Sequence, residues 1–197
     1  MPVAKKESIK YSYNDYIKWP DDERWEIING IAYNMTPAPK IKHQRISWNI
    51  VAIFASHKKE FSQKGCEAFS APTDVVFDEF NVVQPDIFVV CDKNKITEDN
   101  IKGAPDLIIE ITSPSTEIKD RREKKQLYEK FGVGEYIIVF PDREYIERYF
   151  LENGRYQAPE IFNWDETVKL KTFDIKLKLW EIFERELEGE NEDHSKQ

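Results

Sequence analysis

Residues 84–90 have the sequence Gln-Pro-Asp-Ile-Phe-Val-Val, and residues 106–111 have the sequence Asp-Leu-Ile-Ile-Glu-Ile. Both segments are short and apolar, as is typical of strands buried in a sheet. Each contains a carboxylate among its apolar residues, Asp86 in the first and Glu110 in the second. An ionised carboxylate is costly to bury unless it is paired or binds a metal. Either acid alone could lie at a strand end and be satisfied by water or a backbone amide, but together they indicate a polar site in the sheet.

A helix is predicted over residues 117–131, ending before the glycine at position 132. Stepping back from Leu127 and Tyr128 by three and four residues reaches Lys124 and then Asp120. These two charged residues therefore lie on the inward stripe of the helix. The alternative is an i,i+4 ion pair whose aliphatic parts pack while the charges extend to solvent. The helical wheel places Lys125 on the opposite, solvated side.

Asp86, Glu110 and Lys124 together form a pattern suited to phosphodiester hydrolysis. Two carboxylates on neighbouring strands can hold Mg²⁺, which needs only one or two such ligands in addition to water and substrate phosphate. A lysine beside them stabilises the charge that develops on phosphorus. Asp106 follows a second proline but lies four residues from Glu110 on the same strand, about 13 Å away at roughly 3.3 Å per residue. It is expected to shape the entrance of the strand instead of binding the same ion.

The rest of the chain predicts one α/β domain. Asn29-Gly30 indicates a tight hairpin between the segments 25–28 and 31–33. An amphipathic helix is expected over 43–59, paired strands over 73–80 and 82–90, and a buried strand over 135–140. Smaller peripheral strands follow, at 145–150, 155–157, 168–172 and 173–180. The predicted architecture is a single mixed sheet flanked by helices within residues 1–183, followed by an acidic, disordered tail over 184–197.

Two further polar residues are candidates for the site. His43 lies in the first turn of its predicted helix, three residues before Ile46, so it is directed inward and could reach the sheet. A histidine in this position is also commonly a satisfied core or capping group, and His57 is interpreted as a packing residue. Glu26 follows Trp25 in the hairpin, where alternation alone does not decide which face is buried.

Composition limits the function classes. The net charge of −8 disfavours a nucleic-acid partner, but half of that excess lies in the last fourteen residues, which contain six acidic and two basic residues. No apolar run approaches the roughly 18 residues of a membrane span, and the first residues lack the apolar stretch of a signal peptide, so a cytoplasmic protein is expected. Cys66 and Cys91 are far apart in sequence and are expected to be separate buried residues, with no disulfide and no thiolate metal site.

The pattern Pro85-Asp86 followed by Glu110-Ile111-Thr112 resembles the Pro-Asp, Asp/Glu-x-Lys signature of restriction-endonuclease-like nucleases. A larger block is more specific, and it comprises Gln84–Ile87, Pro105–Leu107, Glu110–Thr116, Asp120, Lys124, Tyr128, Gly132-Val133 and Glu135-Tyr136. This block resembles the Uma-two family of endonucleases, which is widespread in cyanobacteria. The likeness extends upstream to 25–30 and to His43-Gln44, so it covers roughly residues 20–157.

The resemblance implies a restriction-endonuclease-like α/β core, a requirement for Mg²⁺ or Mn²⁺, and hydrolysis of DNA. It assigns Asp86 and Glu110 as metal ligands and Lys124 as the lysine, because Thr112 occupies the usual lysine position. Glu26 and His43 match further polar positions of the family near the site. The sequence differs from the family at Asn29 and Ile137, where the family usually has aspartate and tryptophan, and neither position is part of the expected metal site.

The leading interpretation is therefore a metal-dependent DNA endonuclease. Lys119, Arg121, Arg122 and Lys125 are the candidates for a basic surface beside its site. A binding or regulatory module that retains the fold without cleaving DNA is a second hypothesis, motivated by the acidic surface and tail. A hydrolase of small phosphoesters is a third, because surfaces outside the site select the substrate. A homodimer would supply the two sites needed to cut both strands.

Overall fold

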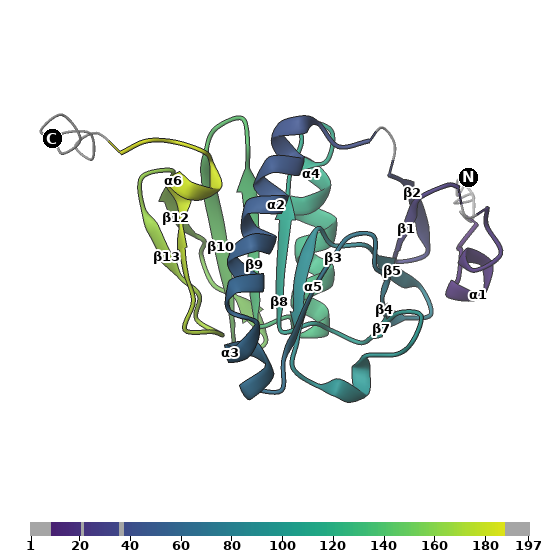
Figure 1. Ribbon diagram of the computed structural model, residues 1–197. Helices are drawn as coiled ribbons and strands as arrows, with labels where there is room; N and C mark the ends of the chain where they lie inside the picture. The colour runs from purple at the N-terminus through teal and green to yellow at the C-terminus, as the bar shows by residue number, and fades with distance from the viewer. Residues whose placement is uncertain (1–8, 21, 36–37, 188–197) are drawn as a thin grey trace, which may run out of the picture.

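The structure, a computed structural model, describes residues 9–20, 22–35 and 38–187. Figure 1 shows a central sheet covered on its two faces by helices, with a second sheet packed to one side. The helical elements are α1 (Tyr13–Tyr16), α2 (Ile41–Ser56), α3 (Lys58–Gln63), η1 (Lys93–Lys95), α4 (Glu117–Lys119), η2 (Asp120–Lys124), α5 (Lys125–Phe131) and α6 (Leu179–Ile182). The strands are β1 (Trp25–Ile28), β2 (Ile31–Asn34), β3 (Glu67–Ser70), β4 (Val75–Asp78), β5 (Asn81–Val83), β6 (Ile87–Val90), β7 (Ile101–Lys102), β8 (Leu107–Ile111), β9 (Glu135–Phe140), β10 (Tyr145–Glu152), β11 (Arg155–Tyr156), β12 (Glu160–Asn163), β13 (Thr167–Lys169) and β14 (Lys176–Lys178).

The central sheet has the order β11-β10-β9-β8-β6-β3, with β12 paired to β10. It is mixed, because β8 and β9 are parallel while β6 and β8 are antiparallel. Successive residues of a strand point to opposite faces, and β8 follows this rule. Leu107, Ile109 and Ile111 pack in the cluster that contains α2, whereas Ile108 packs in the cluster that contains α5. Glu110 therefore points to the α5 face.

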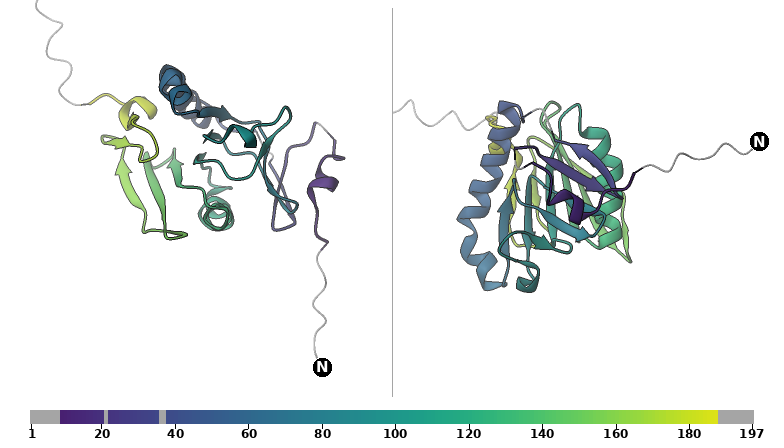
Figure 2. Two further views of the ribbon diagram at one scale, coloured as in Figure 1. Left: turned by 90° about the horizontal axis from the view of Figure 1, so that it is seen from below. Right: turned by 90° about the vertical axis from the view of Figure 1, so that its right-hand side faces the viewer.

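The second sheet has the order β2-β1-β5-β4-β7 and contains the predicted N-terminal hairpin. Asn29 and Gly30 have φ values of 53° and 80°, the positive values that a two-residue hairpin turn requires. The views in Figure 2 show this sheet packed beside the central sheet on the side away from the C-terminal strands. The hairpin therefore lies next to the helix formed by α4, η2 and α5.

Several sequence predictions about strands are wrong. The expected strand over 82–90 is two strands, β5 and β6, which belong to different sheets. Pro85 separates them, since proline lacks the N–H that a continuous central strand needs. The expected single sheet is consequently two larger sheets plus a β13-β14 pair, and β3, β7 and β12 were not expected. The segment 173–180, predicted as a strand, contains the short strand β14 and the start of α6. The predicted α/β class with a mixed sheet flanked by helices is confirmed.

The predicted helix over 117–131 is confirmed, with one irregularity. Its middle, η2, is a π-helical segment, and the helix ends at Gly132 with φ of 84°, the left-handed conformation common after helices. Asp120 and Lys124 both face inward and are 3% exposed. The prediction that these two residues lie on the inward side of the helix is therefore confirmed. Single-turn π-helical segments of this kind are frequent at functional sites.

Some of the C-terminal strands belong to the central sheet, and others do not. β10 pairs with β9 along its length and continues the central sheet, whereas β13 and β14 form a separate pair. The predicted acidic tail lies mostly outside the described residues. Among those residues, no helix has the length and apolar character needed to cross a lipid bilayer.

The two cysteines form a disulfide, contrary to the prediction that they are separate. Cys66 precedes β3 and Cys91 follows β6, and the antiparallel pairing of these strands brings the residues together. Sequence spacing alone did not reveal this, because the pairing of β3 was unforeseen. The bridge closes a 25-residue loop that contains Asp86.

Reduction of this disulfide is expected to lower the free energy of unfolding by about 3 kcal/mol, because the open loop gains conformational freedom when unfolded. The measurement is urea unfolding with and without a phosphine reductant. A double variant with alanine at positions 66 and 91 is the control and is expected not to respond to the reductant. Two titratable thiols in the oxidised wild type would contradict the assignment.

Candidate functional site

Asp86 directly precedes β6, and Glu110 lies near the end of β8, the strand that pairs with β6. β6 and β8 pair in a register that sets Ile87 opposite Ile109, so continuing that register by one residue places Asp86 opposite Glu110. Directly opposed residues of antiparallel strands have Cβ atoms about 5 Å apart. Asp86 is further held by the backbone, since its Oδ2 accepts a hydrogen bond of 2.8 Å from the N–H of Ile111. The two carboxylates are close enough for the charge of Asp86 to raise the pKa of Glu110.

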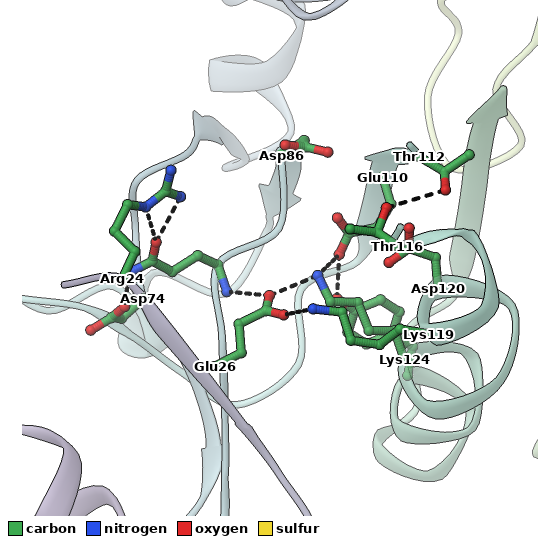
Figure 3. Close-up of polar contacts among 12 residues, drawn as sticks. Arg24, Glu26, Asp74, Asp86, Glu110, Thr112, Thr116, Lys119, Asp120 and Lys124 are labelled. Carbon is green, nitrogen blue, oxygen red and sulfur yellow. Dashed lines mark hydrogen bonds and ion pairs between the residues drawn. The ribbon is translucent and has the colours of Figure 1, made fainter. Parts of the chain in front are cut away.

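Lys124 reaches Glu110 from the helix above this face. Its Nζ lies 2.9 Å from Glu110 Oε1 and 2.7 Å from Glu26 Oε1, as Figure 3 shows. Lys124 and Glu110 are each 3% exposed. Burial lowers the pKa of Lys124, but the charges of Glu110, Glu26 and Asp120 outweigh that effect and raise the pKa well above its usual value. The lysine is therefore a fixed cation between two carboxylates.

Glu26 comes from β1 in the second sheet and is completely buried. Its Oε2 accepts a hydrogen bond of 2.8 Å from Lys119 Nζ, and its Oε1 accepts one of 3.2 Å from the N–H of Gln84. Burial alone would raise its pKa, but Lys124 and Lys119 hold the pKa below its ordinary value. Glu26 is therefore ionised and links the hairpin to the helix that contains both lysines.

His43 lies in the first turn of α2, with Nε2 3.3 Å from Asp86 Oδ2. Its Nδ1 is buried without a hydrogen-bond partner among the described residues. The structure thus brings together all five sequence-predicted site residues, which are Glu26, Asp86, Glu110, Lys124 and His43. His57 does not join them, because its Nδ1 contacts the carbonyl oxygen of Ile53 in its own helix, 2.8 Å away.

Asp106 holds the start of β8 in place. Its Oδ2 accepts a hydrogen bond of 2.7 Å from the N–H of Cys91, and its own N–H donates to the carbonyl oxygen of Val89. It thus fixes the start of β8 against the end of β6. This position agrees with the expectation that it shapes the strand entrance.

Carboxylates outnumber lysines around Glu110. Burial raises the pKa of Glu110 to about 8, and the charges of Asp86, Asp120 and Glu26 act in the same direction, opposed by Lys124. Burial also raises the pKa of Asp120, opposed by Lys124 and by a hydrogen bond with Thr116. With every acid ionised, the four carboxylates exceed the charge of Lys119 and Lys124 by two units. A divalent cation would balance this excess.

The donor set of the site fits Mg²⁺ or Mn²⁺. Within the described parts of the chain, no three histidine, cysteine, aspartate or glutamate side chains are arranged to hold one ion. Asp86 and Glu110 are the sequence-predicted candidates for its side-chain ligands, and water and substrate oxygens would complete the shell. Mg²⁺ is commonly bound in this way, by one or two carboxylates with several waters. The carboxylate oxygens and the charge excess both suit a hard divalent cation.

Sequence reasoning missed two groups that order the site. Tyr128 was interpreted as an apolar residue, yet its hydroxyl donates a hydrogen bond of 2.6 Å to Glu110 Oε1. Gln84 was noted only as part of a motif, yet its side-chain oxygen accepts from Arg24 and its amide nitrogen donates to Asp74, at 2.9 Å. The signal for Tyr128 was its i+4 spacing from Lys124 on the inward stripe. The Gln84 network joins distant segments, and local spacing does not reveal it.

The predicted basic surface is partly occupied by intramolecular contacts. Lys119 pairs with Glu26, and Arg121 pairs with Glu147. The Nζ of Lys125 lies 4.7 Å from the ring centroid of Tyr149, and Arg122 is exposed. Two of the four predicted cations therefore already neutralise carboxylates of the protein.

Comparison with known proteins places these observations in a family context. The sequence profile of the Uma2 family, described as "Putative restriction endonuclease", matches residues 13–180. A cyanobacterial relative from Synechocystis, "Uncharacterized protein slr1290", is 30% identical over 122 residues, which are 60% of this chain and 62% of the relative, so the match spans less than two thirds of that protein. A similar solved structure is described as "a putative nuclease belonging to DUF820 from Anabaena variabilis". It has a TM-score of 0.72 at 24% identity, covering 88% of this chain and 97% of that one, which supports the fold.

Proposed function

The chain belongs to the Uma2 family of restriction-endonuclease-like proteins, and from this premise we propose that it is a metal-dependent endonuclease that hydrolyses phosphodiester bonds in DNA. The observation that carries the proposal is the placement of Lys124 beside two neighbouring carboxylates, Asp86 and Glu110. The lysine lies 2.9 Å from Glu110 Oε1. In metal-dependent hydrolysis of a phosphodiester, the ion activates water and a nearby cation helps to stabilise the added negative charge.

In the proposed mechanism Asp86 and Glu110 hold Mg²⁺ or Mn²⁺. When bound, the ion lowers the pKa of a coordinated water and polarises a phosphoryl oxygen. Lys124 contributes a permanent positive charge, because Glu26 and Glu110 keep its pKa well above neutral. It therefore acts as an electrostatic stabiliser and not as a general base. Asp86 is oriented by the backbone N–H of Ile111 and by His43.

DNA as a substrate requires attraction that the net charge of −8 does not provide. We propose that a local basic surface close to the site makes the contact, with exposed Arg122 as one member. Cleavage is then strongly salt-dependent, because each phosphate contact releases counterions. Two copies would supply the sites needed to cut both strands.

The test compares the two Pro-Asp aspartates. Supercoiled plasmid is incubated at low salt with Mg²⁺ or Mn²⁺, with wild type and with Asp86→Asn and Asp106→Asn variants. Wild type is expected to nick the plasmid and EDTA to stop it. Asp86→Asn is expected to abolish nicking because it removes a charged ligand. Asp106→Asn is expected to retain nicking, because an amide oxygen still accepts the Cys91 N–H.

Intact plasmid with wild type across metals and salt concentrations would overturn the endonuclease proposal. Retention of metal binding without cleavage would then favour the binding or regulatory module. Cleavage of a small phosphodiester in place of plasmid would favour the small-substrate hydrolase. Equal loss in both aspartate variants would mean that the effect is structural and that Asp86 has no special role.

A further inference from the structure

Tyr128 places a buried phenol hydroxyl against the proposed metal site. The residue lies on α5, four positions after Lys124, and is completely buried. Its hydroxyl donates a hydrogen bond of 2.6 Å to Glu110 Oε1, the same oxygen that accepts the 2.9 Å bond from Lys124 Nζ. Both donors therefore converge on one carboxylate oxygen, and Oε2 carries neither of these bonds.

We propose that Tyr128 is a positioning residue for Glu110, which holds the carboxylate so that Oε2 is the oxygen presented to the divalent cation. This inference rests on the proposed function. A glutamate side chain has three rotatable bonds, and a single donor leaves its carboxylate free to rotate about the contact. Two donors at fixed positions on one helix define both the location of Oε1 and the direction of Oε2. Partners of metal ligands commonly tune affinity in this way.

The Tyr128 side chain is enclosed by aromatic rings and by Glu110. Burial raises the pKa of Tyr128 well above its ordinary value, and the neighbouring charge of Glu110 acts in the same direction. The ring itself packs against Phe77 and Tyr136, with centroids 5.8 Å and 5.0 Å away. Phenylalanine would preserve this packing and remove only the hydroxyl.

Tyr136 offers a matched control. It is also completely buried and packs against Tyr128. Its hydroxyl donates a hydrogen bond of 3.1 Å to the carbonyl oxygen of Asp120, and so bonds to the backbone instead of a metal ligand. A Tyr136→Phe variant therefore removes a buried hydroxyl from the same aromatic cluster without touching Glu110.

The experiment measures Mn²⁺ binding by electron paramagnetic resonance in wild type, Tyr128→Phe and Tyr136→Phe, without DNA. Tyr128→Phe is expected to weaken Mn²⁺ binding about 10-fold, the lower end of the range for partners of metal ligands. Tyr136→Phe is expected to bind as wild type does. A second readout is the rise in melting temperature with added Mn²⁺, which is expected to need higher concentrations in Tyr128→Phe. Circular dichroism checks that both variants fold.

The outcomes separate this inference from the proposed function. If wild type binds Mn²⁺ and Tyr128→Phe binds it equally well, the positioning role is overturned while the endonuclease proposal stands. Equal weakening in both tyrosine variants also overturns it, because the effect then belongs to any buried hydroxyl of the cluster. If wild type binds no Mn²⁺, the metal-dependent function fails and the positioning role fails with it.

Discussion

Replacement of Lys124 by methionine is expected to lower the rate constant of DNA cleavage by about 10²–10³-fold, the usual cost of removing one preorganised group that stabilises transition-state charge. Methionine keeps much of the aliphatic volume of lysine, so the change is mainly the loss of the charge. Lys124 Nζ lies 2.9 Å from Glu110 Oε1. The expected loss is in the catalytic rate, with a smaller change in the concentration of DNA that gives half of the maximal rate.

Lys125→Met is the matched control. It removes the same kind of charge one residue further along the helix, where Lys125 contacts the ring of Tyr149 outside the site. The measurement is single-turnover nicking of plasmid at saturating Mn²⁺. Circular dichroism measures the folded fraction of each variant. A Lys124→Met enzyme as active as wild type, or one no worse than Lys125→Met, would remove Lys124 from the mechanism.

Replacement of Glu26 by alanine is expected to lower the free energy of unfolding by about 3–5 kcal/mol, the typical cost of removing one partner from a buried ion pair. Glu26 is completely buried and contacts both Lys119 and Lys124. Without it, Lys124 retains Glu110, whereas Lys119 loses its carboxylate. The variant also removes the carboxylate that accepts the hydrogen bond from the N–H of Gln84, two residues before Asp86.

Urea unfolding followed by tryptophan fluorescence measures this effect. Glu181→Ala is the control, because Glu181 pairs with Lys178 on the surface with both side chains about half exposed, and such pairs contribute about 1 kcal/mol or less. If Glu26→Ala destabilises the protein no more than Glu181→Ala does, the buried ion-pair network is not a source of stability. The expected order is wild type, Glu181→Ala, then Glu26→Ala.

The sequence identified the buried charged residues better than it predicted the sheets. The charged positions of the 117–131 helix were identified because a helix has 3.6 residues per turn, so a charged residue on its apolar side stands out in the sequence. Asp120 and Lys124 are indeed buried. Glu110 was found for the same reason, as a carboxylate inside an apolar strand. Local periodicity decides such cases without knowledge of the neighbours.

Partners distant in sequence were not predictable in this way. The division of 82–90 between two sheets depends on which strands pair with β5 and β6, and apolar composition is the same in either sheet. The disulfide depends on β3, whose exposed residues carry little strand pattern. The ion pairs of Glu26 join residues 93 and 98 positions apart, and alternation in a four-residue strand does not indicate which face meets a helix.

The order of the site residues along the chain has a consequence during synthesis. Glu26, His43, Asp86 and Glu110 all precede the helix that supplies Lys119, Lys124 and Tyr128. A ribosome therefore completes both proposed metal ligands, Asp86 and Glu110, before the cation and the phenol that order them. Nascent chains and fragments cut before residue 117 contain both proposed metal ligands but lack these groups. On the proposed function, the cell is thus not exposed to an active nuclease before synthesis has passed the helix.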